Sequence, residues 1–245
     1  MVLKISVTIL TKNAEKNLEK TLESVKNFSD IIILDNGSTD NTLAIAERYP
    51  HVRIFKSSFI GFGPLHNLAS SYALYDWIFS IDSDEVLSEA LFDEITTLQL
   101  EEKLVYSCPR KNFYQGRHVK GCGWGTDRVV RLFNRHFFSF SQDQVHEKVM
   151  APRISIVNLK KPLLHTPYHS VSDFLRKMQL YSDLFAEQSH RKSSPLIALG
   201  HGFMAFFKSY ILKKGLFDGY AGFLISAYNG HTAFYKYLKL YEKQR

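Results

Sequence analysis

The sequence predicts an α/β protein built on a mostly parallel β-sheet, and two observations support this fold class. Up to residue 82 of the 245, short apolar runs rich in β-branched residues alternate with segments of helical periodicity. Strands separated by helices of this length form βαβ units, and parallel sheets of this kind are covered on both faces. The expected strands are residues 4–10, 30–35, 51–56 and 76–82, and the expected helices are residues 15–27, 41–49 and 64–75.

The pattern changes after residue 103. Residues 104–114, 127–135 and 146–157 are strand-like pieces that follow one another without helices, which is typical of antiparallel additions to a sheet. The first two are joined by the loop "QGRHVKGCGWGTD", whose glycine spacing lacks the strand–turn–helix context of a dinucleotide fingerprint. Residues 172–245 show helical spacing and predict a C-terminal helical region. None of its apolar runs has the length and continuity expected of a membrane span.

Composition and charge narrow the class of partner. With 45% hydrophobic residues the chain can bury one sizeable core. A net charge of +7 and a pI near 9.2 predict an anionic partner, and leave open nucleic acid, a phospholipid surface or a phosphorylated substrate. Lys and Arg gather from Leu159 onward. The opening residues predict no secretory signal, hence a cytoplasmic location. Cys108 and Cys122 lack metal-ligand spacing and are assigned no role.

Polar side chains follow the predicted strands at the points where the strands end. Thr11 and Asn13 follow the first strand, Asp35 ends the second and Asp82 ends the fourth. In open α/β sheets ligands bind outside the carboxyl ends of the strands. These residues are therefore expected to converge on one ligand-binding edge.

The stretch "WIFSIDSDEVLSEAL" places three carboxylates directly after a buried strand. Asp82 and Asp84 can direct oxygens at one Mg²⁺ or Mn²⁺, a cation that shares its shell with substrate phosphates. The alternative is a helix cap, in which Ser83 or Asp84 precedes acids of a first turn. The D-x-D spacing alone leaves both interpretations open.

Four motifs occur in order and resemble the pattern of family 2 glycosyltransferases with the GT-A fold. They are "TILTKNAEKNLEKTLESV", "IIILDNGSTDNT", "GFGPLHNLA" and "WIFSIDSDEVLS". Within that family the chain resembles the lipopolysaccharide core glycosyltransferases of the WaaE/KdtX type. This resemblance extends through "GWGTDRVVRLFNR", "DQVHEKV" and "PLLHTPYHSVSDFLRKMQLYS" to "GLFDGYAGFLISAY", and so covers nearly the whole chain.

The resemblance implies a GT-A, Rossmann-like nucleotide-diphospho-sugar transferase domain at residues 1–168. Within it, residues 1–100 would bind the nucleotide sugar and residues 101–168 would form the acceptor side. Residues 169–245 would be a helical region that contacts a membrane surface or another copy of the chain. The implied nucleotide-sugar residues are Thr11, Asn13, Glu15, Asp35 (at the base or ribose), Asn67 and Asp82. Asp84 is the implied metal ligand on the donor diphosphate.

The resemblance also implies an inverting reaction, which needs a base for the acceptor hydroxyl and positive charge for the departing diphosphate. Glu147, in "DQVHE", matches the position of the usual base, with Asp143 and Asp127 as rivals. The alternative for Glu147 is an exposed acid at a strand end. His146 is expected to be a neighbour that shapes the site.

His165, in "PLLHTPYH", matches a histidine that many GT-A enzymes use as a metal or diphosphate ligand. A neutral imidazole suits Mn²⁺, although a lone histidine is more often structural. Arg128 and Arg131 could reach phosphate or a charged acceptor, or belong to a solvated strand face. The chain departs from the subgroup at Gly125-Thr126, where Tyr-Pro is frequent, and at Gln142, where an acid is frequent.

The implied activity is metal-dependent, non-processive transfer of one sugar, of glucosyl or heptosyl type, from a UDP- or ADP-linked donor. Non-processive transfer is expected because the Q-x-x-R-W motif is absent. The implied acceptor is a glycolipid of the lipopolysaccharide inner core, with another polysaccharide or a protein as alternatives. A sugar-nucleotide pyrophosphorylase is disfavoured by the missing Gly- and Arg-containing loop after the first strand. A basic nucleic-acid-binding protein is disfavoured by the lack of any recognition motif.

The basic, aromatic tail predicts contact with a membrane surface, and the resemblance implies that this surface is the cytoplasmic face of the inner membrane. Amphipathic basic helices with aromatic residues lie at membrane surfaces, and the alternative is ordinary packing onto the α/β domain. The side chains expected at the surface are Phe203, Phe206, Phe207, Lys208, Lys213 and Lys214.

Overall fold

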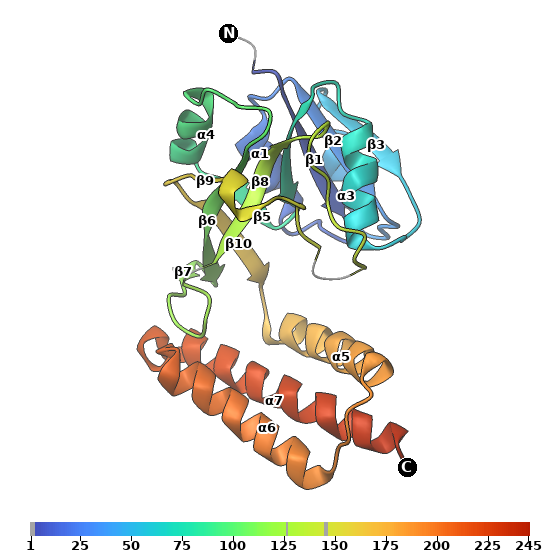
Figure 1. The fold of residues 1–245 in the computed structure, drawn as a ribbon, viewed down its shortest axis with the longest axis vertical. Coiled ribbons are helices and arrows are strands. Elements are labelled where there is room, and N and C mark those ends of the chain that lie inside the picture. Colours follow the sequence, from blue (N-terminus) through green and yellow to red (C-terminus); the bar gives the residue numbers. More distant parts are fainter. Residues whose placement is uncertain (1–2, 126, 145–146) are drawn as a thin grey trace. The chain divides into compact units, whose positions relative to one another are not determined.

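The computed structural model describes residues 3–125, 127–144 and 147–245, which form two compact units (Figure 1). Unit 1 comprises residues 1–110 and 128–165, and unit 2 comprises residues 111–127 and 166–245. Each unit has its own hydrophobic cluster. Residues 111–127, which the sequence placed on the acceptor side, group with the C-terminal helices, and the predicted functional division at residue 168 stays a prediction.

The first half of unit 1 is a parallel sheet with helical crossovers. Its strands are β1 (Ile5–Thr11), β2 (Asp30–Asp35), β3 (Val52–Lys56) and β4 (Trp77–Asp82), in the spatial order β3-β2-β1-β4. The helices are α1 (Leu18–Val25), α2 (Thr42–Ala46) and α3 (Phe62–Ser71). The register places Thr11 opposite Asp35 and Leu10 opposite Asp82. The ends of three strands therefore meet at one edge.

Alternation along β1 explains why helices cover both faces of the sheet. Ile9 packs in the cluster that includes Leu22 of α1, whereas Leu10 packs in the cluster that includes Leu65 of α3. Successive side chains of a strand point to opposite faces, so both faces are apolar and both need a helical cover.

Antiparallel and short strands extend the sheet on the β4 side. β8 (Arg128–Asn134) pairs antiparallel with β4, and β6 (Val105–Tyr114) pairs antiparallel with β8. The sheet continues from β6 to β10 (Leu163–Tyr168) and β5 (Glu85–Leu87), while β7 (Arg117–His118) and β9 (Ile156–Asn158) pair with β6. α4 (Glu89–Thr96) and η1 (Arg153–Ser155) complete the connections.

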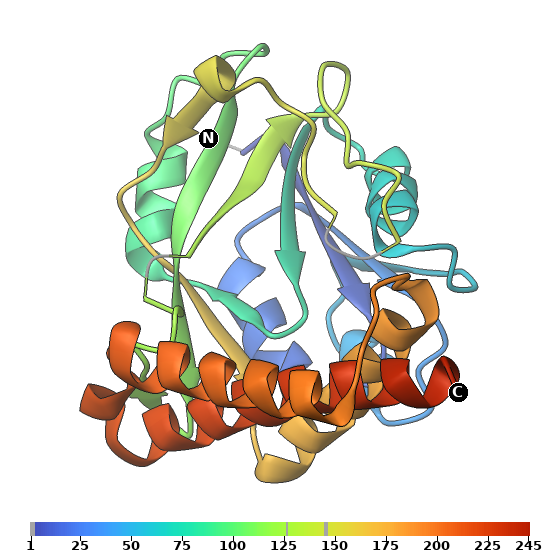
Figure 2. The same ribbon diagram turned by 60° about the horizontal axis from the view of Figure 1, so that its bottom comes forward.

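Unit 2 consists of three long helices and the loop before β8. The helices are α5 (Val171–Gln188), α6 (Pro195–Phe207) and α7 (Gly219–Lys243), with the π-helical turn η2 (Lys208–Leu212) and the 3₁₀ turn η3 (Gly215–Asp218) between α6 and α7. Figure 2 shows α6 and α7 lying side by side along their lengths. Tyr114, Tyr168, Phe174 and Ile225 form the buried cluster of this unit.

The predicted fold class is confirmed: a mostly parallel sheet with antiparallel additions and C-terminal helices. Two sequence predictions are wrong. The described part of the piece at 146–157, residues 147–157, forms β9, the 3₁₀ turn η1 and an isolated bridge between Phe140 and Val149 instead of one strand. The expectation that no tail segment has the length of a membrane span also fails, because the π turn continues α6 into one apolar helix, Pro195–Leu212. By length and composition that helix is sufficient to cross a membrane, and 11% of it is buried.

Candidate active site

The loops after β1 and β2 are tied together by the side chain of Asp35. This buried carboxylate accepts hydrogen bonds from the Thr11 hydroxyl (3.2 Å), the Gly37 N–H (3.0 Å) and the Ser38 N–H (3.0 Å). Burial alone would raise the pKa of Asp35, but the Ser38 hydroxyl and these donors lower it overall. Asp35 is therefore ionised at neutral pH and fixes the loop that follows it.

Asn13 and Glu15 fasten the same two loops further out. Asn13 has a φ of 52°, a left-handed conformation that asparagine tolerates, and its Oδ1 accepts the Thr39 N–H at 2.8 Å. Glu15 Oε2 accepts the Asn41 N–H at 3.2 Å and the Asn41 amide at 3.1 Å. Thr11, Asn13, Glu15 and Asp35 thus lie together, as predicted, although each already has a partner within the protein.

A hydroxyl of helix α1 contacts the backbone of the turn that contains the D-x-D acids. The Thr21 hydroxyl lies 3.0 Å from the Ser83 carbonyl oxygen and 2.8 Å from that of Glu85. A buried hydroxyl bound to two carbonyls fixes the turn, so the intervening Asp84 is presented in a defined position.

Asp84 faces His165, the residue predicted to share its metal. His165 Nε2 lies 3.4 Å from Asp84 Oδ1, and both side chains are largely buried, 13% and 28% exposed. Among the described residues no group of three or more His, Cys, Asp and Glu side chains could hold a metal ion. A carboxylate and an imidazole nevertheless fit a Mg²⁺ or Mn²⁺ that takes its remaining ligands from a diphosphate and water.

Asp82 and Glu85, the outer acids of the turn, bind arginines instead. Arg131 donates to Asp82 Oδ2 and, at 2.6 Å, to Glu85 Oε1, which also accepts Arg110 Nη1 at 3.0 Å. Burial opposes the charge of Asp82, but Arg131, His66 and His165 lower its pKa to about 2. Burial raises the pKa of Glu85, and the arginines offset this only partly. The three carboxylates thus have three different surroundings.

His66 of helix α3 extends the site toward Glu147. Its Nδ1 lies 3.1 Å from the Ser80 hydroxyl, its ring stacks on Phe140, and its Nε2 lies 3.9 Å from Glu147 Oε1. Burial lowers the pKa of His66 to about 4, so the imidazole is neutral at pH 7. Glu147 is 24% exposed and so remains accessible beside a buried neutral ring.

The segment bearing Glu147 is fastened to the start of α3. The N–H of Gly63 donates to the Asp143 carbonyl at 3.2 Å, and a Cβ on Gly63 would overlap the Ser141 carbonyl oxygen. Asn67 donates to the Phe140 carbonyl at 3.0 Å and accepts its N–H at 2.8 Å. These contacts explain why a glycine is needed at Gly63, the second glycine of "GFG", and they give Asn67 a structural role. The predicted contact of Asn67 with the nucleotide stays a prediction.

The structure distinguishes between some of the remaining candidate residues. Asp143 is exposed and uses its backbone carbonyl on α3, whereas Glu147 is partly buried next to His66, which favours Glu147 over Asp143 as the base. Arg128 donates to the carbonyls of Ser107 (2.9 Å) and Leu159 (2.7 Å), so it has a structural role. His146 and Thr126 lie outside the described residues.

Three site residues were missed from the sequence: His66, Glu85 as a buried anchor, and Arg110. His66 looks like an ordinary residue of an apolar helix, and its partners are 14 and 81 positions away. The one available signal was a histidine directly before Asn67 in a motif already expected at the nucleotide.

A parallel sheet with acids and a histidine at its strand ends, and a further acid beside a buried imidazole, defines a site suited to a nucleotide-diphosphate sugar. Residues 6–151 match the sequence profile of Glycosyl transferase family 2. Since this match covers more than half of the chain, the protein belongs to that family and is a nucleotide-sugar glycosyltransferase with a GT-A-like fold.

Relatives and solved structures agree with this family. An uncharacterised glycosyltransferase of Rickettsia typhi is 27% identical over 255 residues, 98% of this chain and 87% of the relative. The lipopolysaccharide core biosynthesis glycosyltransferase LpsC of Rhizobium meliloti is 26% identical, over 98% of this chain and 93% of the relative. The fold is similar to that of residues 1–349 of Staphylococcus aureus TarS in complex with UDP, with a TM-score of 0.51, 16% identity, and coverage of 99% of this chain and 92% of that one.

Proposed function

We propose that the protein transfers a single sugar, with inversion, from a nucleotide-diphosphate donor to an anionic glycolipid, and that a divalent metal is required. The observation that carries the proposal is the pairing of Asp84 with His165 at 3.4 Å, on the same strand-end edge as the carboxylate Asp35. Asp82 connects the two halves of the site, because both His66 and His165 lower its pKa.

In this mechanism the chain's own residues position and deprotonate. Glu147 takes the proton from the acceptor hydroxyl, whose oxygen attacks the anomeric carbon while the bond to the diphosphate breaks on the opposite face. Neutral His66 keeps water and charge away from one side of Glu147. A metal held by Asp84 and His165 would neutralise charge on the departing diphosphate.

The donor is proposed to be UDP-linked, with an ADP-linked sugar as the alternative. The TarS structures of the same fold contain UDP and UDP-GlcNAc. Thr11, Asn13, Glu15 and Asp35 form a rigid rim at the carboxyl ends of β1 and β2, where nucleotides bind in open α/β sheets. Rigidity of this rim lowers the ordering cost of donor binding.

The acceptor is proposed to be the inner core of lipopolysaccharide, receiving a glucosyl- or heptosyl-type sugar at the cytoplasmic face of the inner membrane. This proposal is supported by the similarity to LpsC, a lipopolysaccharide core biosynthesis glycosyltransferase matched over 93% of its length, and by the motif resemblance that extends past residue 151. A lipid-linked acceptor bearing phosphates also suits the net charge of +7.

A donor screen tests the proposal. Thermal unfolding is followed with UDP-glucose, UDP-GlcNAc and ADP-heptose, each with and without Mn²⁺. A donor at 100 times its Kd stabilises the folded state by about 2.7 kcal/mol, so a true donor raises Tm, and more so with Mn²⁺. Transfer to extracted core glycolipid is then measured with that donor. The proposal fails if no nucleotide sugar raises Tm, or if DNA binds with a steep salt dependence instead.

A further inference from the structure

Helices α6 and α7 pack against each other through their smallest side chains. α6 buries Ala198 and Gly202, and α7 buries Gly222, Ser226 and Gly230 at four-residue spacing. Gly230 meets α6, whereas Gly222 and Ser226 meet the η2–η3 connection. A Cβ on Gly202 would lie 3.2 Å from the Gly230 carbonyl oxygen, and a Cβ on Gly230 would lie 3.1 Å from that of Gly202. Such close approach of backbones through small residues is typical of helices that pack in lipid.

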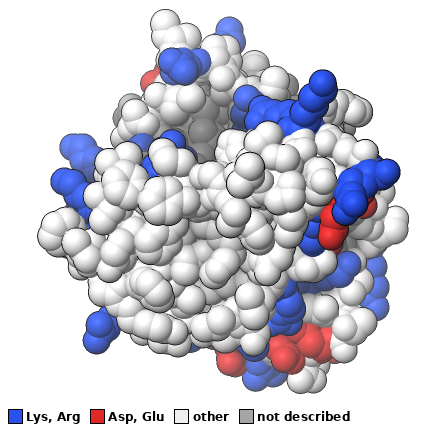
Figure 3. Space-filling view, turned by 90° about the horizontal axis from the view of Figure 1, so that it is seen from below, with Lys and Arg blue, Asp and Glu red and all other residues white. Residues whose placement is uncertain are grey.

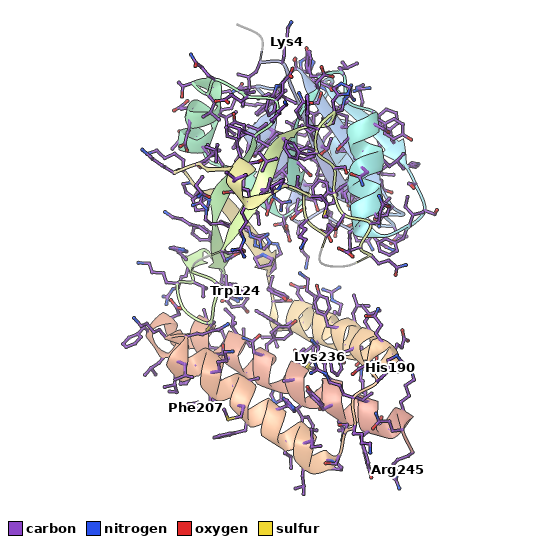
Figure 4. The ribbon with its side chains drawn as sticks, viewed as in Figure 1. Lys4, Trp124, His190, Phe207, Lys236 and Arg245 are labelled. Atoms are coloured by element: carbon purple, nitrogen blue, oxygen red, sulfur yellow. The ribbon has the colours of Figure 1, made fainter. Side chains whose placement is uncertain are left out.

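Large apolar side chains of α6, of η3 and of the first turns of α7 point outward. Leu196 is 80% exposed, Phe203 67% and Phe217 82%. We call the exposed set the apolar surface; its members used here are Leu196, Leu199, Phe203, Phe217, Tyr220 and Phe223. Figure 3 shows this side of unit 2 as a broad area without charged side chains. In Figure 4 the labelled Phe207 side chain projects away from the ribbon of α6. A helix folded in water buries such residues and exposes its small ones, so the arrangement is inverted relative to water.

The apolar surface is also hollowed. A cavity of about 510 Å³ lies between α6 and α7, lined by four phenylalanines, small residues, Leu199 and one histidine, His231. Exposed apolar concavities of this kind accommodate an apolar ligand segment such as an acyl chain.

Charge distinguishes between the occupants of this surface. Between Glu187 and Asp218 the sequence contains Arg191, Lys192 and three further lysines but no acid. Asp218 itself accepts the N–H groups of Lys120 and Gly121, at 3.1 and 2.5 Å. A second copy of the chain would bring like charges together, whereas an anionic lipid leaflet complements them.

The helices also indicate how deeply the surface enters the lipid. Within the described residues, Pro195–Leu212 is the one helix with the length and composition of a span. Its partner α7 carries Lys236, Lys239 and Lys243, and Lys239 pairs with Asp183. Because α6 is packed along a helix that cannot enter hydrocarbon over its length, the pair fits the plane of the interface rather than a path across the bilayer.

We infer that the apolar surface of α6, η3 and the first turns of α7 inserts into one leaflet of an anionic phospholipid membrane, with Lys208, Lys213 and Lys214 on the headgroups. This inference depends on unit 2 alone and not on the proposed reaction, so vesicle binding and sugar transfer test them separately. Apolar insertion supplies binding that salt does not remove, and the exposed lysines add a salt-sensitive part.

The test uses the full chain and sedimentation with phosphatidylglycerol/phosphatidylcholine vesicles. The variant Phe203→Glu with Phe217→Glu is compared with Leu74→Glu and Ile154→Glu, control substitutions of exposed apolar residues of unit 1, 65% and 94% exposed. The partition coefficient is expected to fall at least tenfold in the Phe variant and less than twofold in the control. Circular dichroism checks that each variant is folded. If the Phe→Glu variant is not folded, Phe203→Ser with Phe217→Ser is used in its place.

A second pair of variants, equal to each other in net charge, tests the lysines. Lys208, Lys213 and Lys214 are replaced by Glu in one variant, and the exposed Lys103, Lys160 and Lys161 in the other. Only the first is expected to lose the salt-sensitive part of binding. Wild-type protein should be released by alkaline carbonate, as befits an in-plane helix pair.

Three results would overturn the inference. The first is binding of the Phe variant equal to that of wild type. The second is resistance to carbonate, which indicates a spanning helix. The third is a dimer in solution that the Phe203→Glu substitution dissociates, without vesicle binding by wild type, which would assign the surface to a second copy.

Discussion

The strand-end edge of unit 1 and the α6–α7 pair of unit 2 differ in which side chains they bury. At the edge, Glu85 is fully buried between Arg110 and Arg131, and large apolar residues such as Phe79 form the core. In the α6–α7 pair, glycines are buried and phenylalanines face outward. Burial follows the solvent that a surface meets, so two apolar segments of one chain can be built for water and for lipid.

Both kinds of packing, large buried aromatic side chains and small buried residues, occur within unit 2. Phe174 of α5 is buried and stacks on Tyr168 with ring centroids 3.9 Å apart, and Tyr228 of α7 packs beside both. α7 therefore presents an ordinary aromatic core to α5 and small residues to α6.

The largest effect is expected at the partly buried acid of the edge. Glu147→Gln keeps size and hydrogen bonding but cannot accept the acceptor proton, so turnover should fall by about 10²- to 10⁴-fold while donor affinity survives. Asp143→Asn is the control, because Asp143 is exposed and interacts through its backbone. Steady-state kinetics with donor titration measure both. If the two variants exchange these behaviours, the base is Asp143.

One residue type can be compared across the two regions. Phe79 is 1% exposed and stacks against Phe28, so Phe79→Ala should lower the free energy of unfolding by about 3–5 kcal/mol. Phe203 is 67% exposed, so Phe203→Ala should change it by less than about 0.5 kcal/mol in water. Urea denaturation of the vesicle-free protein gives both values. A comparable loss at Phe203 would mean that its ring is buried and the contrast is wrong.

A smaller, pH-dependent effect is expected from His66. Its folded pKa of about 4 lies below the ordinary value of 6.5, so the unfolded state binds its proton first. The contribution of neutral His66 to the free energy of unfolding is fully present above pH 6.5. It is lost as the pH falls toward 4 and below, by about 3 kcal/mol at most. Of the charged groups near the ring, Asp82 opposes the shift in pKa and Arg131 reinforces it. The Glu147 carboxylate also lies 3.9 Å from Nε2.

Urea denaturation between pH 7 and pH 4 measures this loss. His66→Asn should flatten the profile in that window, whereas the exposed control His51→Asn should leave it unchanged. A profile for His66→Asn with the wild-type slope would show that the imidazole is not the titrating group.

Much of the fold and part of the site could be predicted from the sequence. Alternation of apolar runs with helical segments predicted the parallel strands. The family resemblance implied Asp84 and His165 as metal ligands, and the antiparallel pairing of β5 with β10 brings their side chains together. The role of Glu85 could not be predicted, because its arginines come from β6 and β8, which join the site only through long-range pairing.

Two further features depend on tertiary context. Asn67 was expected at the nucleotide, and its amide binds the backbone of Phe140, 73 residues away. The tail was expected to contain no apolar run with the length and continuity of a membrane span, yet α6 and the π turn form one apolar helix, Pro195–Leu212. The close approach to α7 tolerates and uses Gly202, and the π turn carries the helix past Lys208.

The most direct measurement of the central claim is calorimetric titration of UDP into wild type and Asp84→Asn, with and without Mn²⁺. Mn²⁺ is expected to tighten UDP binding to wild type at least tenfold, about 1.4 kcal/mol. Asp84→Asn should lose this gain while its metal-free affinity is unchanged. Asp93→Asn, an exposed acid of α4, should behave as wild type. Equal Mn²⁺ enhancement in Asp84→Asn, or none in wild type, would contradict a metal-diphosphate site at this strand end.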